Sequence, residues 1–389
     1  MIAAAVSLLW ALVVATLIAR AARQYRAYEV LQPVPLLGAA PMIDIVVPAR
    51  NEADAIGDCL AGLVAQDYPA SHVAITVVDD GSTDGTAAVA RGLGDGAVPL
   101  ALIEAGPLPA GWTGKTHACW RGAAQGRGEW LCFIDADTIP AAALLRSAIT
   151  AARQRGLDLL SLEPRQVLVT VGERLIIPAG LCALGFAGDL RRTGNPDNPS
   201  AAANGQFLLI RRAAYERAGG HRAVRGAFSE DSALAARVKL TGGRIAVMGA
   251  APLIGVRMYR SLPQLCEGVV RSVTDTFGGL GATAFIALAG LVIAWSAVAI
   301  PAMLTTHVAA APTPLAGAAL ALAVAASLAL LGMHVAAARY FAIPLGYGLL
   351  FPVAYTLAAF LALAGIRARW QGRVAWKGRS YRSAADSGG

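Results

Sequence analysis

The sequence predicts an α/β protein with a mostly parallel sheet, joined to apolar helices at both ends. Short apolar runs alternate with helical stretches in the middle of the chain, as is typical of parallel strands joined by right-handed crossovers. A mean hydropathy of +0.54 with 15% charged residues is also too apolar for an ordinary soluble protein. This apolar excess lies at the two ends, and the middle of the chain looks globular.

The expected strands are apolar runs that end in polar turns, as strands buried on both faces do. In chain order they are IDIVVPARNE (43–52), VAITVVDDGS (73–82), PLALIEA (99–105) and EWLCFIDADT (129–138). The expected helices between them follow residue 55, begin in TDGTAAVARGL (83–93), and lie in GKTHACWRGAAQG (114–126).

The N-terminal segment, residues 1–26, is predicted to be a transmembrane anchor. Residues 2–19 carry no charge, and a bilayer-spanning helix needs about 20 apolar residues. A cleaved signal peptide is the alternative, but no charged region precedes the apolar run and arginines follow it. Those arginines, which begin at Arg20, predict that the following domain is cytoplasmic.

Three apolar segments, near 281–304, 314–337 and 343–365, predict further transmembrane segments over 281–365. If all of them cross, the basic tail over 366–389 lies outside, whereas its charge favours the cytoplasm. Pro344 and Pro352 interrupt the last segment, which makes it a candidate for a re-entrant or interfacial segment. We expect a multi-pass protein of the cell inner (plasma) membrane with a cytoplasmic tail.

The net charge and the cysteine content indicate which partners and which redox compartment to expect. Anionic lipid headgroups near membrane-flanking arginines explain the net charge of +8. No nucleic-acid recognition motif is visible, and no partner protein is evident. The five cysteines form no C-x-x-C pair and indicate a reducing compartment, and the histidines lack zinc-ligand spacing.

Polar clusters follow the first, second and fourth strands, at 48–52, 79–84 and 135–137. Ligands of open α/β sheets bind beyond the carboxyl ends of the strands, which is where these clusters belong. Two acidic clusters at one edge repel each other unless a cation or cationic ligand lies between them. Oxygen ligands with D-x-D spacing suit Mg²⁺ or Mn²⁺, which would also hold a diphosphate.

The motifs in the middle of the chain resemble those of a known family. The motifs IVVPARNE, VVDDGSTDGT, GKTHACWRGAAQGRGEWLCFIDAD, NGQFLLIRRAAYERAGGH and SED resemble, in this order, those of family 2 glycosyltransferases with the GT-A fold. The resemblance predicts a catalytic domain over 40–260. The anchor, LPAGWTGK and WKGRSY are similar to membrane enzymes that act on lipids, of the hopanoid-biosynthesis-associated type, with carotenoid and ceramide glycosyltransferases as relatives.

The resemblance implies a nucleotide-sugar site. It assigns Asp79 and Asp80 to the base and ribose, with Pro48, Arg50 and Glu52 lining the same site. The alternative for the acidic pair is a helix-capping turn, a role that suits Asp84. Arg50 either meets phosphate or pairs with Glu52.

The D-x-D is Asp135 and Asp137. The resemblance implies that Asp137 binds the metal and that Asp135 touches ribose or a metal-bound water; an acidic strand end facing solvent is the alternative. Lys115, in a G-K pair before a helix, is expected to reach nucleotide or phosphate unless it is only a solvated lysine at a helix start.

Glu230 and Asp231 match the family's E-D pair, in which one carboxylate takes the proton of the acceptor hydroxyl. We favour Asp231 as that base, with Glu230 as its rival or as a metal-side partner. The alternative is an acidic helix N-terminus. His221 is expected to be structural, and the Q-x-x-R-W signature of processive synthases is not clear here.

Two amphipathic stretches, 260–280 and 172–190, are predicted to be interfacial helices that hold the site at headgroup level; ordinary core helices are the alternative. The resulting hypothesis is a membrane-anchored inverting glycosyltransferase. It would move a sugar from a nucleotide donor, expected to be UDP-linked, to a lipid-like acceptor such as a hopanoid. The alternatives are a processive polysaccharide synthase and a catalytically degenerate GT-A scaffold.

Overall fold

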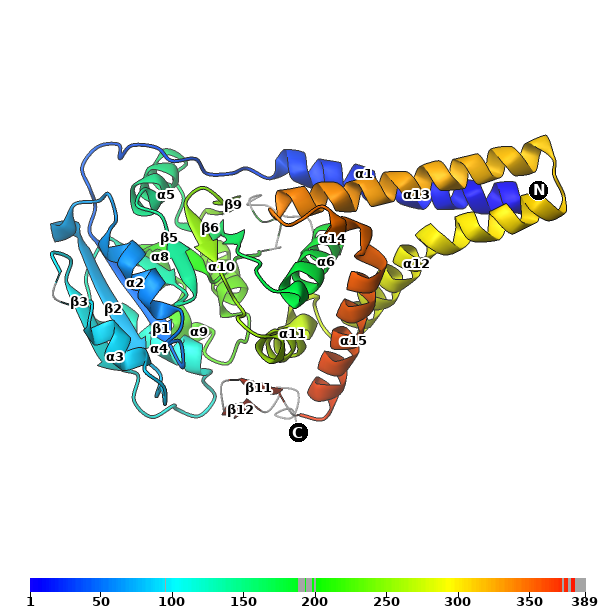
Figure 1. Ribbon diagram of the computed structural model, residues 1–389. Coiled ribbons are helices and arrows are strands. Elements are labelled where there is room, and N and C mark those ends of the chain that lie inside the picture. The colour runs from blue at the N-terminus through cyan, green and yellow to red at the C-terminus, as the bar shows by residue number, and fades with distance from the viewer. Residues whose placement is uncertain are drawn as a thin grey trace.

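A mixed seven-stranded sheet forms the centre of a globular domain, and three long helices project from that domain as an arm (Figure 1). The computed structural model describes residues 1–94, 96–187, 193, 198, 201–372, 374–376 and 379–381.

The large sheet has the strand order β3-β2-β1-β4-β8-β6-β9. Its strands are β1 (Ile43–Ala49), β2 (Val73–Asp79), β3 (Leu100–Glu104), β4 (Trp130–Ile134), β6 (Leu159–Glu163), β8 (Phe207–Arg211) and β9 (Ile245–Gly249). All run parallel except β8, which pairs antiparallel with both β4 and β6. The predicted α/β class with a mostly parallel sheet is confirmed, although the alternation of strands and helices gave no sign of the reversed strand.

Helices cover both faces of this sheet. They are α2 (Ile56–Val64), α3 (Thr86–Arg91), α4 (Gly114–Ala123), α5 (Leu144–Gln154), α8 (Arg212–Arg217), α9 (Gly220–Ala223) and α10 (Glu230–Leu240), with a 3₁₀ turn at Ala70–His72. Successive strand residues point to opposite faces. Ile45 therefore packs in the core with α2 and α5, while Val46 packs with α4 and α10. Both side chains are fully buried, as the apolar run predicted.

Smaller strands complete the domain. A three-stranded sheet contains β5 (Thr138–Pro140), β10 (Ile254–Val256) and β7 (Arg165–Gln166), and the tail contributes a hairpin of β11 (Val374–Trp376) and β12 (Arg379–Tyr381). Because β5 starts directly after the D-x-D and pairs with β10, the segment after β10 lies beside that motif.

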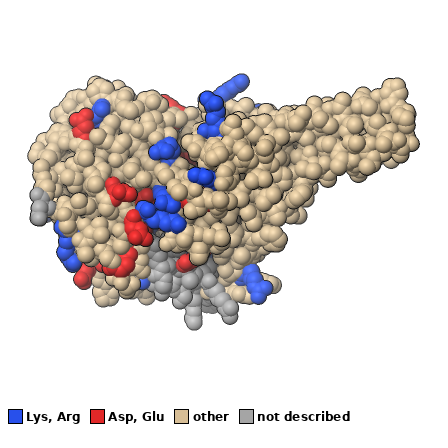
Figure 2. Space-filling view, in the orientation of Figure 1, with Lys and Arg blue, Asp and Glu red and all other residues tan. Residues whose placement is uncertain are grey.

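The arm consists of α1 (Ile2–Ala27), α12 (Leu280–Ala310) and α13 (Pro314–Tyr340) (Figure 1). The indole Nε1 of Trp10 on α1 donates to Ser327 Oγ on α13 at 3.0 Å. With α15 (Phe351–Trp370), these are the helices of the described chain that are long and apolar enough to cross a membrane. Figure 2 shows no Lys, Arg, Asp or Glu along the visible face of the arm, whereas charged side chains are scattered over the globular part.

Helix α15 does not follow the arm but runs across its base (Figure 1). It packs against α6 (Val171–Ala187), α11 (Leu262–Thr276) and α12, and the short α14 (Gly346–Leu349) precedes it. Gly365 allows the close approach to α11, because a Cβ there would lie 2.5 Å from Val273 Cγ1. Pro352 lies in the first turn of α15, where its missing N–H breaks no helical hydrogen bond. It therefore begins the helix rather than interrupting it.

The amphipathic stretch α11 buries Leu265 and Val273, and α15 lies along it. Two polar contacts involve the long apolar helices α1 and α15. Arg369 at the end of α15 donates to both carboxylate oxygens of Asp275, at 2.6 and 2.8 Å. Tyr28, just after α1, donates its hydroxyl to Glu163 at 2.6 Å. The first contact joins α15 to α11, and the second joins the end of α1 to β6.

Candidate active site

The carboxyl ends of β1, β2 and β4 meet at one edge of the sheet. The parallel register sets Ala49 opposite Asp79, and β4 pairs with β1 on the other side. The polar turns that follow these strands therefore converge, and they carry most of the site residues that the sequence predicted.

Arg50 and Asp80 form a pair across two of these turns. Asp80 is only 5% exposed, and its N–H donates to Ala49 O at 2.8 Å. Arg50 Nη1 donates to the carbonyl oxygen of Asp80 and lies 4.0 Å from its carboxylate. From the sequence, phosphate and Glu52 were the expected partners of Arg50, and Asp80 was not among them. The contact with Asp80 holds the guanidinium beside the turn that follows β2.

The neighbouring carboxylates organise the VVDDGSTDGT turn itself. Asp79 accepts from Ser82 N–H at 3.2 Å and from the Ser82 hydroxyl. Asp84 accepts from Thr86 N–H at 2.9 Å and from Ala53 N–H at 3.1 Å. It therefore bonds the first N–H of α3, although the residue at the N-cap position is Gly85. Burial raises the pKa of Asp84, but the hydrogen bonds from Thr86 and Ala53 outweigh that effect and lower it overall.

The first polar turn is tied to the second. Glu52 N–H donates to Thr86 Oγ1 at 2.8 Å. Pro48 sits in β1 opposite Val78, one residue before the strand ends. Both residues border the turn that carries Asp79 and Asp80, at the place where the resemblance puts the nucleotide.

Lys115 joins the D-x-D to the E-D pair. Its Nζ lies 2.8 Å from Asp135 Oδ1 and 2.8 Å from Glu230 Oε1. The lysine is held at the start of α4, where Thr113 caps the helix by accepting from Thr116 N–H at 3.2 Å. Lys115 is therefore more than a solvated lysine at a helix start, because its side chain bridges two carboxylates.

The charges around this bridge shift the pKa values of the two residues of the E-D pair in opposite directions. Burial raises the pKa of Glu230, but Lys115 outweighs it and lowers that pKa, so Glu230 stays ionised. Burial and then the charge of Glu230 raise the pKa of Asp231 to about 7. For Lys115, burial lowers the pKa, and the charges of Asp135 and Glu230 reverse this and raise it well above its usual value.

Hydrogen bonds orient the Asp231 carboxylate. Oδ2 accepts from Gly205 N–H and Oδ1 from Ser232 N–H, both at 2.7 Å. A carboxylate held in place with a pKa near neutrality is suited to accept a proton at physiological pH.

Gly205 is a site residue that the sequence reasoning did not single out. A Cβ at this position would lie 3.0 Å from Lys115 Nζ, 3.2 Å from Asp231 Oδ2 and 3.3 Å from Glu230 Oε1. The backbone of Gly205 thus lies against Lys115 and the E-D pair. The Asn-Gly pair before β8 was the available signal, because such a pair marks a turn in which the backbone can approach closely.

The D-x-D fits a divalent cation that is shared with a ligand. In the described part of the chain, no group of three or more His, Cys, Asp or Glu side chains is placed to hold a metal by itself. Mg²⁺ is commonly bound through one or two carboxylates together with substrate phosphates. Lys115 already holds Asp135, and the expectation that Asp137 binds such an ion stays a prediction.

Arg257 lies beside this position. Its N–H donates to Asp137 O at 3.2 Å, and its Nε is 3.6 Å from Glu173 Oε1 at the start of α6. The backbone of Arg257 therefore lies beside the D-x-D, while its guanidinium is paired with Glu173.

His221 is part of the core. It is 1% exposed, and its N–H donates to the Tyr215 hydroxyl at 3.1 Å, while its ring packs edge-on against Phe133. Burial lowers its pKa to about 4. The expectation of a structural histidine agrees with this neutral, packed environment.

Comparison with known proteins places this domain. The family model described as "Glycosyltransferase like family 2" matches residues 40–274, more than half of the chain, and the protein has the GT-A fold. The chain belongs to glycosyltransferase family 2.

The sequence is similar to 4,4'-diaponeurosporenoate glycosyltransferase of Staphylococcus aureus strains MRSA252 and USA300, at 28% identity over 240 residues. That match covers 61% of this chain and 62% of each relative, so it spans less than two thirds of their length. The fold is similar to that of the mannosyltransferase PcManGT from Pyrobaculum calidifontis, solved with GDP-Man and Mn²⁺. The TM-score is 0.53 at 20% identity, over 94% of this chain and 98% of that one.

Proposed function

We propose that this protein is a membrane glycosyltransferase that transfers one sugar from a nucleotide donor to a hydroxyl of a lipid-like acceptor. The Lys115 bridge is the observation that carries the proposal, because it joins a D-x-D to an E-D carboxylate pair within one hydrogen-bonded cluster. Family membership and the GT-A fold support the reaction class.

The donor side of the proposal uses the edge of β1, β2 and β4. Asp79 and Asp80 would contact the base and ribose, with Pro48, Arg50 and Glu52 around them. Lys115 would contact the donor from the other side of the site. We propose a UDP-linked donor, and Mg²⁺ or Mn²⁺ bound by Asp137 with Asp135 nearby.

Such a cation would supply charge neutralisation for the leaving diphosphate. Lys115, already between two carboxylates, would contribute positive charge on the same side. The backbone of Arg257 is next to Asp137, and we propose that its guanidinium would contact diphosphate oxygens.

Asp231 is the proposed base. The acceptor oxygen attacks the anomeric carbon, the bond from that carbon to the diphosphate breaks, and the hydroxyl proton passes to the Asp231 carboxylate. Glu230 is kept ionised by Lys115 and raises the proton affinity of its neighbour. A single displacement of this kind inverts the anomeric centre, which is the stereochemistry we propose.

The acceptor is proposed to be a lipid. The helices of the arm and α15 are apolar enough for a bilayer, and a relative is named as a 4,4'-diaponeurosporenoate glycosyltransferase. A hopanoid is the particular acceptor that the sequence resemblance favours.

The direction of the helices supports a topology. The N-terminus and the α12–α13 connection lie at the far end of the arm, and the catalytic domain lies at its base (Figure 1). We propose that α1, α12 and α13 cross the membrane, while α15 lies along the interface at the base. The tail would then lie on the same side as the catalytic domain, which removes the conflict raised by counting α15 as a span.

Charge supports the cytoplasmic side for that base. Arginines flank the domain-proximal ends of the membrane helices: Arg20, Arg23 and Arg26 on α1, Arg339 on α13, and Arg367 and Arg369 on α15. Positive flanking residues favour the cytoplasm. We therefore propose an inner-membrane protein whose catalytic domain faces the cytoplasm.

The proposal is tested by donor turnover. Full-length protein in lipid nanodiscs is incubated with UDP- and GDP-sugars, with Mn²⁺ or Mg²⁺, and with a bacterial neutral-lipid extract. We expect nucleotide release that chelation abolishes and that Asp137→Ala reduces at least 100-fold, with Asp58→Ala, an exposed carboxylate on α2, as the control. Full activity in Asp137→Ala would overturn the metal assignment.

A further inference from the structure

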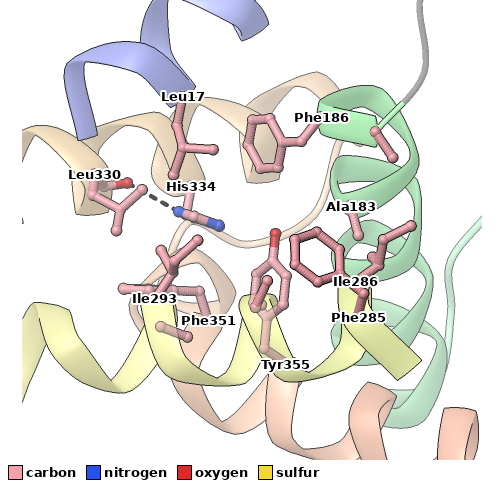
Figure 3. Close-up of a pocket in the computed structure, with 14 residues that line it drawn as sticks. Leu17, Ala183, Phe186, Phe285, Ile286, Ile293, Leu330, His334, Phe351 and Tyr355 are labelled. Atoms are coloured by element: carbon pink, nitrogen blue, oxygen red, sulfur yellow. Dashed lines mark hydrogen bonds between the residues drawn. The ribbon is translucent and has the colours of Figure 1, made fainter. Parts of the chain in front are cut away.

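A cavity of about 180 Å³ lies among the membrane helices, at the base of the arm. It is bounded by α1, α6, α12, α13 and α15, and its wall is made of aliphatic and aromatic side chains (Figure 3). Representative members are Leu17, Ala183, Ile293, Leu330 and Phe351. An apolar cavity of roughly 150 Å³ stays dry and admits a small ring, so this one is large enough for a ring or a chain end.

His334 contributes a polar atom to this wall. The residue is 8% exposed, and its ring stacks on Phe351 with centroids 4.3 Å apart. Nδ1 donates to Leu330 O at 2.9 Å, which assigns the proton to Nδ1 and leaves Nε2 as an acceptor (Figure 3). Within the described residues, Nε2 has no hydrogen-bond partner.

Tyr355 adds a second polar group. Its hydroxyl points into the cavity in Figure 3, and its ring lies edge-on to His334 with centroids 5.7 Å apart. The cavity therefore offers an acceptor on one side chain and a hydroxyl on another, within an otherwise apolar wall.

The chemistry of this wall specifies the ligand. None of the residues lining the cavity is Lys, Arg, Asp or Glu, so a charged headgroup would be buried without a counter-charge, which is costly. A purely apolar ligand would leave the His334 acceptor unsatisfied. A neutral lipid that carries a hydroxyl satisfies both conditions, because it fills the apolar space and donates a hydrogen bond to Nε2.

Helix α6 connects this cavity to the D-x-D. Glu173 in its first turn is paired with Arg257, whose N–H donates to Asp137 O. Ala183, ten residues further along, lines the cavity, and ten helical residues span about 15 Å. A ligand in the cavity is thus within about one lipid length of the site.

We propose that this cavity is the loading site for the acceptor, where a neutral lipid hydroxyl is held by His334 before it reaches Asp231. This inference rests on the proposed function, because it assumes that a lipid hydroxyl is the acceptor. It adds the class of that lipid, uncharged and hydroxylated, and the place at which it leaves the bilayer.

Photolabelling tests the site directly. Full-length protein in phosphatidylcholine nanodiscs is irradiated with octadecan-1-ol that carries a mid-chain diazirine, or with the matching diazirine-bearing octadecane. We expect the alcohol to label peptides of α6 and α12 at the cavity at least five-fold more than the alkane. His334→Phe, which keeps the ring stack but lacks the acceptor, should remove that preference, and His334→Gln should restore part of it.

Matched variants control for general effects of substitution. His307→Phe changes an exposed histidine near the end of α12 and should leave the labelling unchanged. Ala289→Phe fills the cavity from α12 and should reduce alcohol labelling five- to ten-fold, whereas Ala302→Phe, exposed on the same helix, should not. Equal labelling by alcohol and alkane in the unaltered protein, or labelling that ignores Ala289→Phe, would overturn the proposal.

Kinetics separate this proposal from the proposed function. His334→Phe should raise the KM for a lipid acceptor about five- to ten-fold with kcat and Mn²⁺-dependent nucleotide binding unchanged, because only ground-state binding is lost. A protein that transfers sugar to lipid but shows no KM change in His334→Phe contradicts the loading site alone. A protein that binds alcohol in the cavity yet turns over no nucleotide sugar contradicts the proposed function instead.

Discussion

The GT-A domain and the long apolar helices differ in the kind of site that each one forms. In the domain, the edge of the sheet gathers carboxylates, a lysine and backbone N–H groups into a connected polar cluster around Lys115. In the helices, an apolar cavity holds one histidine acceptor and one tyrosine hydroxyl. Under the proposed function, the donor would be recognised by charge and hydrogen bonds, and the acceptor by apolar volume with one hydrogen bond to His334.

The largest effect is expected when the proposed base is removed without disturbing the proposed donor site. Asp231→Asn keeps the shape of the side chain but is a far poorer proton acceptor, so we expect kcat to fall about 10²- to 10⁴-fold. Calorimetric binding of nucleotide with Mn²⁺ should be unchanged. Asp58→Asn on the surface of α2 is the matched control, and activity within a few-fold of normal in Asp231→Asn would contradict the assignment.

The pH dependence sharpens the division of roles within the E-D pair. Asp231 must be deprotonated to act as a base, so kcat/KM should fall as pH drops below about 7, the raised pKa of this group. Glu230→Gln removes the negative charge that helps to raise that pKa, and the acid limb should therefore move to lower pH. The measurement is kcat/KM for the donor between pH 5 and 9.

Two results would count against this account. An acid limb that moves to higher pH in Glu230→Gln would mean that Glu230 does not raise the pKa of its neighbour. Loss of all activity at every pH, with donor binding intact, would make Glu230 the base and Asp231 its partner.

Gly205→Ala tests how closely the backbone must approach the Lys115 bridge. The added Cβ would sit 3.0 Å from Lys115 Nζ, closer than usual, and the lysine end must shift by a few tenths of an ångström. We expect kcat to fall about ten-fold, since small misplacements of catalytic groups are costly, with the melting temperature nearly unchanged. Gly242→Ala, where nothing lies within 4 Å but φ is +82°, should instead lower stability and spare kcat.

The contact between α15 and α11 is expected to give the smallest effect. Arg369 and Asp275 are each 22% exposed and form a bidentate pair, so a double-mutant cycle with alanine should yield a coupling energy of about 1 kcal/mol in thermal unfolding. Arg369 also lies over the ring of Phe228, two residues before Glu230. A coupling energy of zero would mean that α15 is not held to the domain through this pair.

Much of the candidate site was predictable because strand ends follow from apolar runs. The runs before Asp79 and Asp135 predicted two buried parallel strands, and parallel strands bring their carboxyl ends to one edge. The partner of Arg50 was not predictable, because the choice between phosphate, Glu52 and Asp80 depends on the path of two turns. The role of Gly205 was missed because this residue acts by lacking a side chain, which lets the backbone approach Lys115 closely. A single sequence gives little sign of such a role.

The apolar composition of the long helices was predictable from the sequence, but the direction in which α15 runs was not. Apolar length identified α12, α13 and α15 as candidates, but the crossing of α15 over the base depends on close packing at Gly365 against Val273 and at Gly290 against Tyr355. The cavity beside His334 arises from five helices that meet, so no motif encodes it.

The most direct test of the account is the identity of the product. Purified full-length protein is supplied with an isotopically labelled nucleotide sugar, Mn²⁺ and a neutral-lipid extract, and the chloroform-soluble products are analysed by mass spectrometry. The account predicts a hydroxylated neutral lipid that has gained a single sugar, absent in Asp231→Asn. A water-soluble sugar polymer, or label that stays entirely outside the lipid fraction, would contradict it.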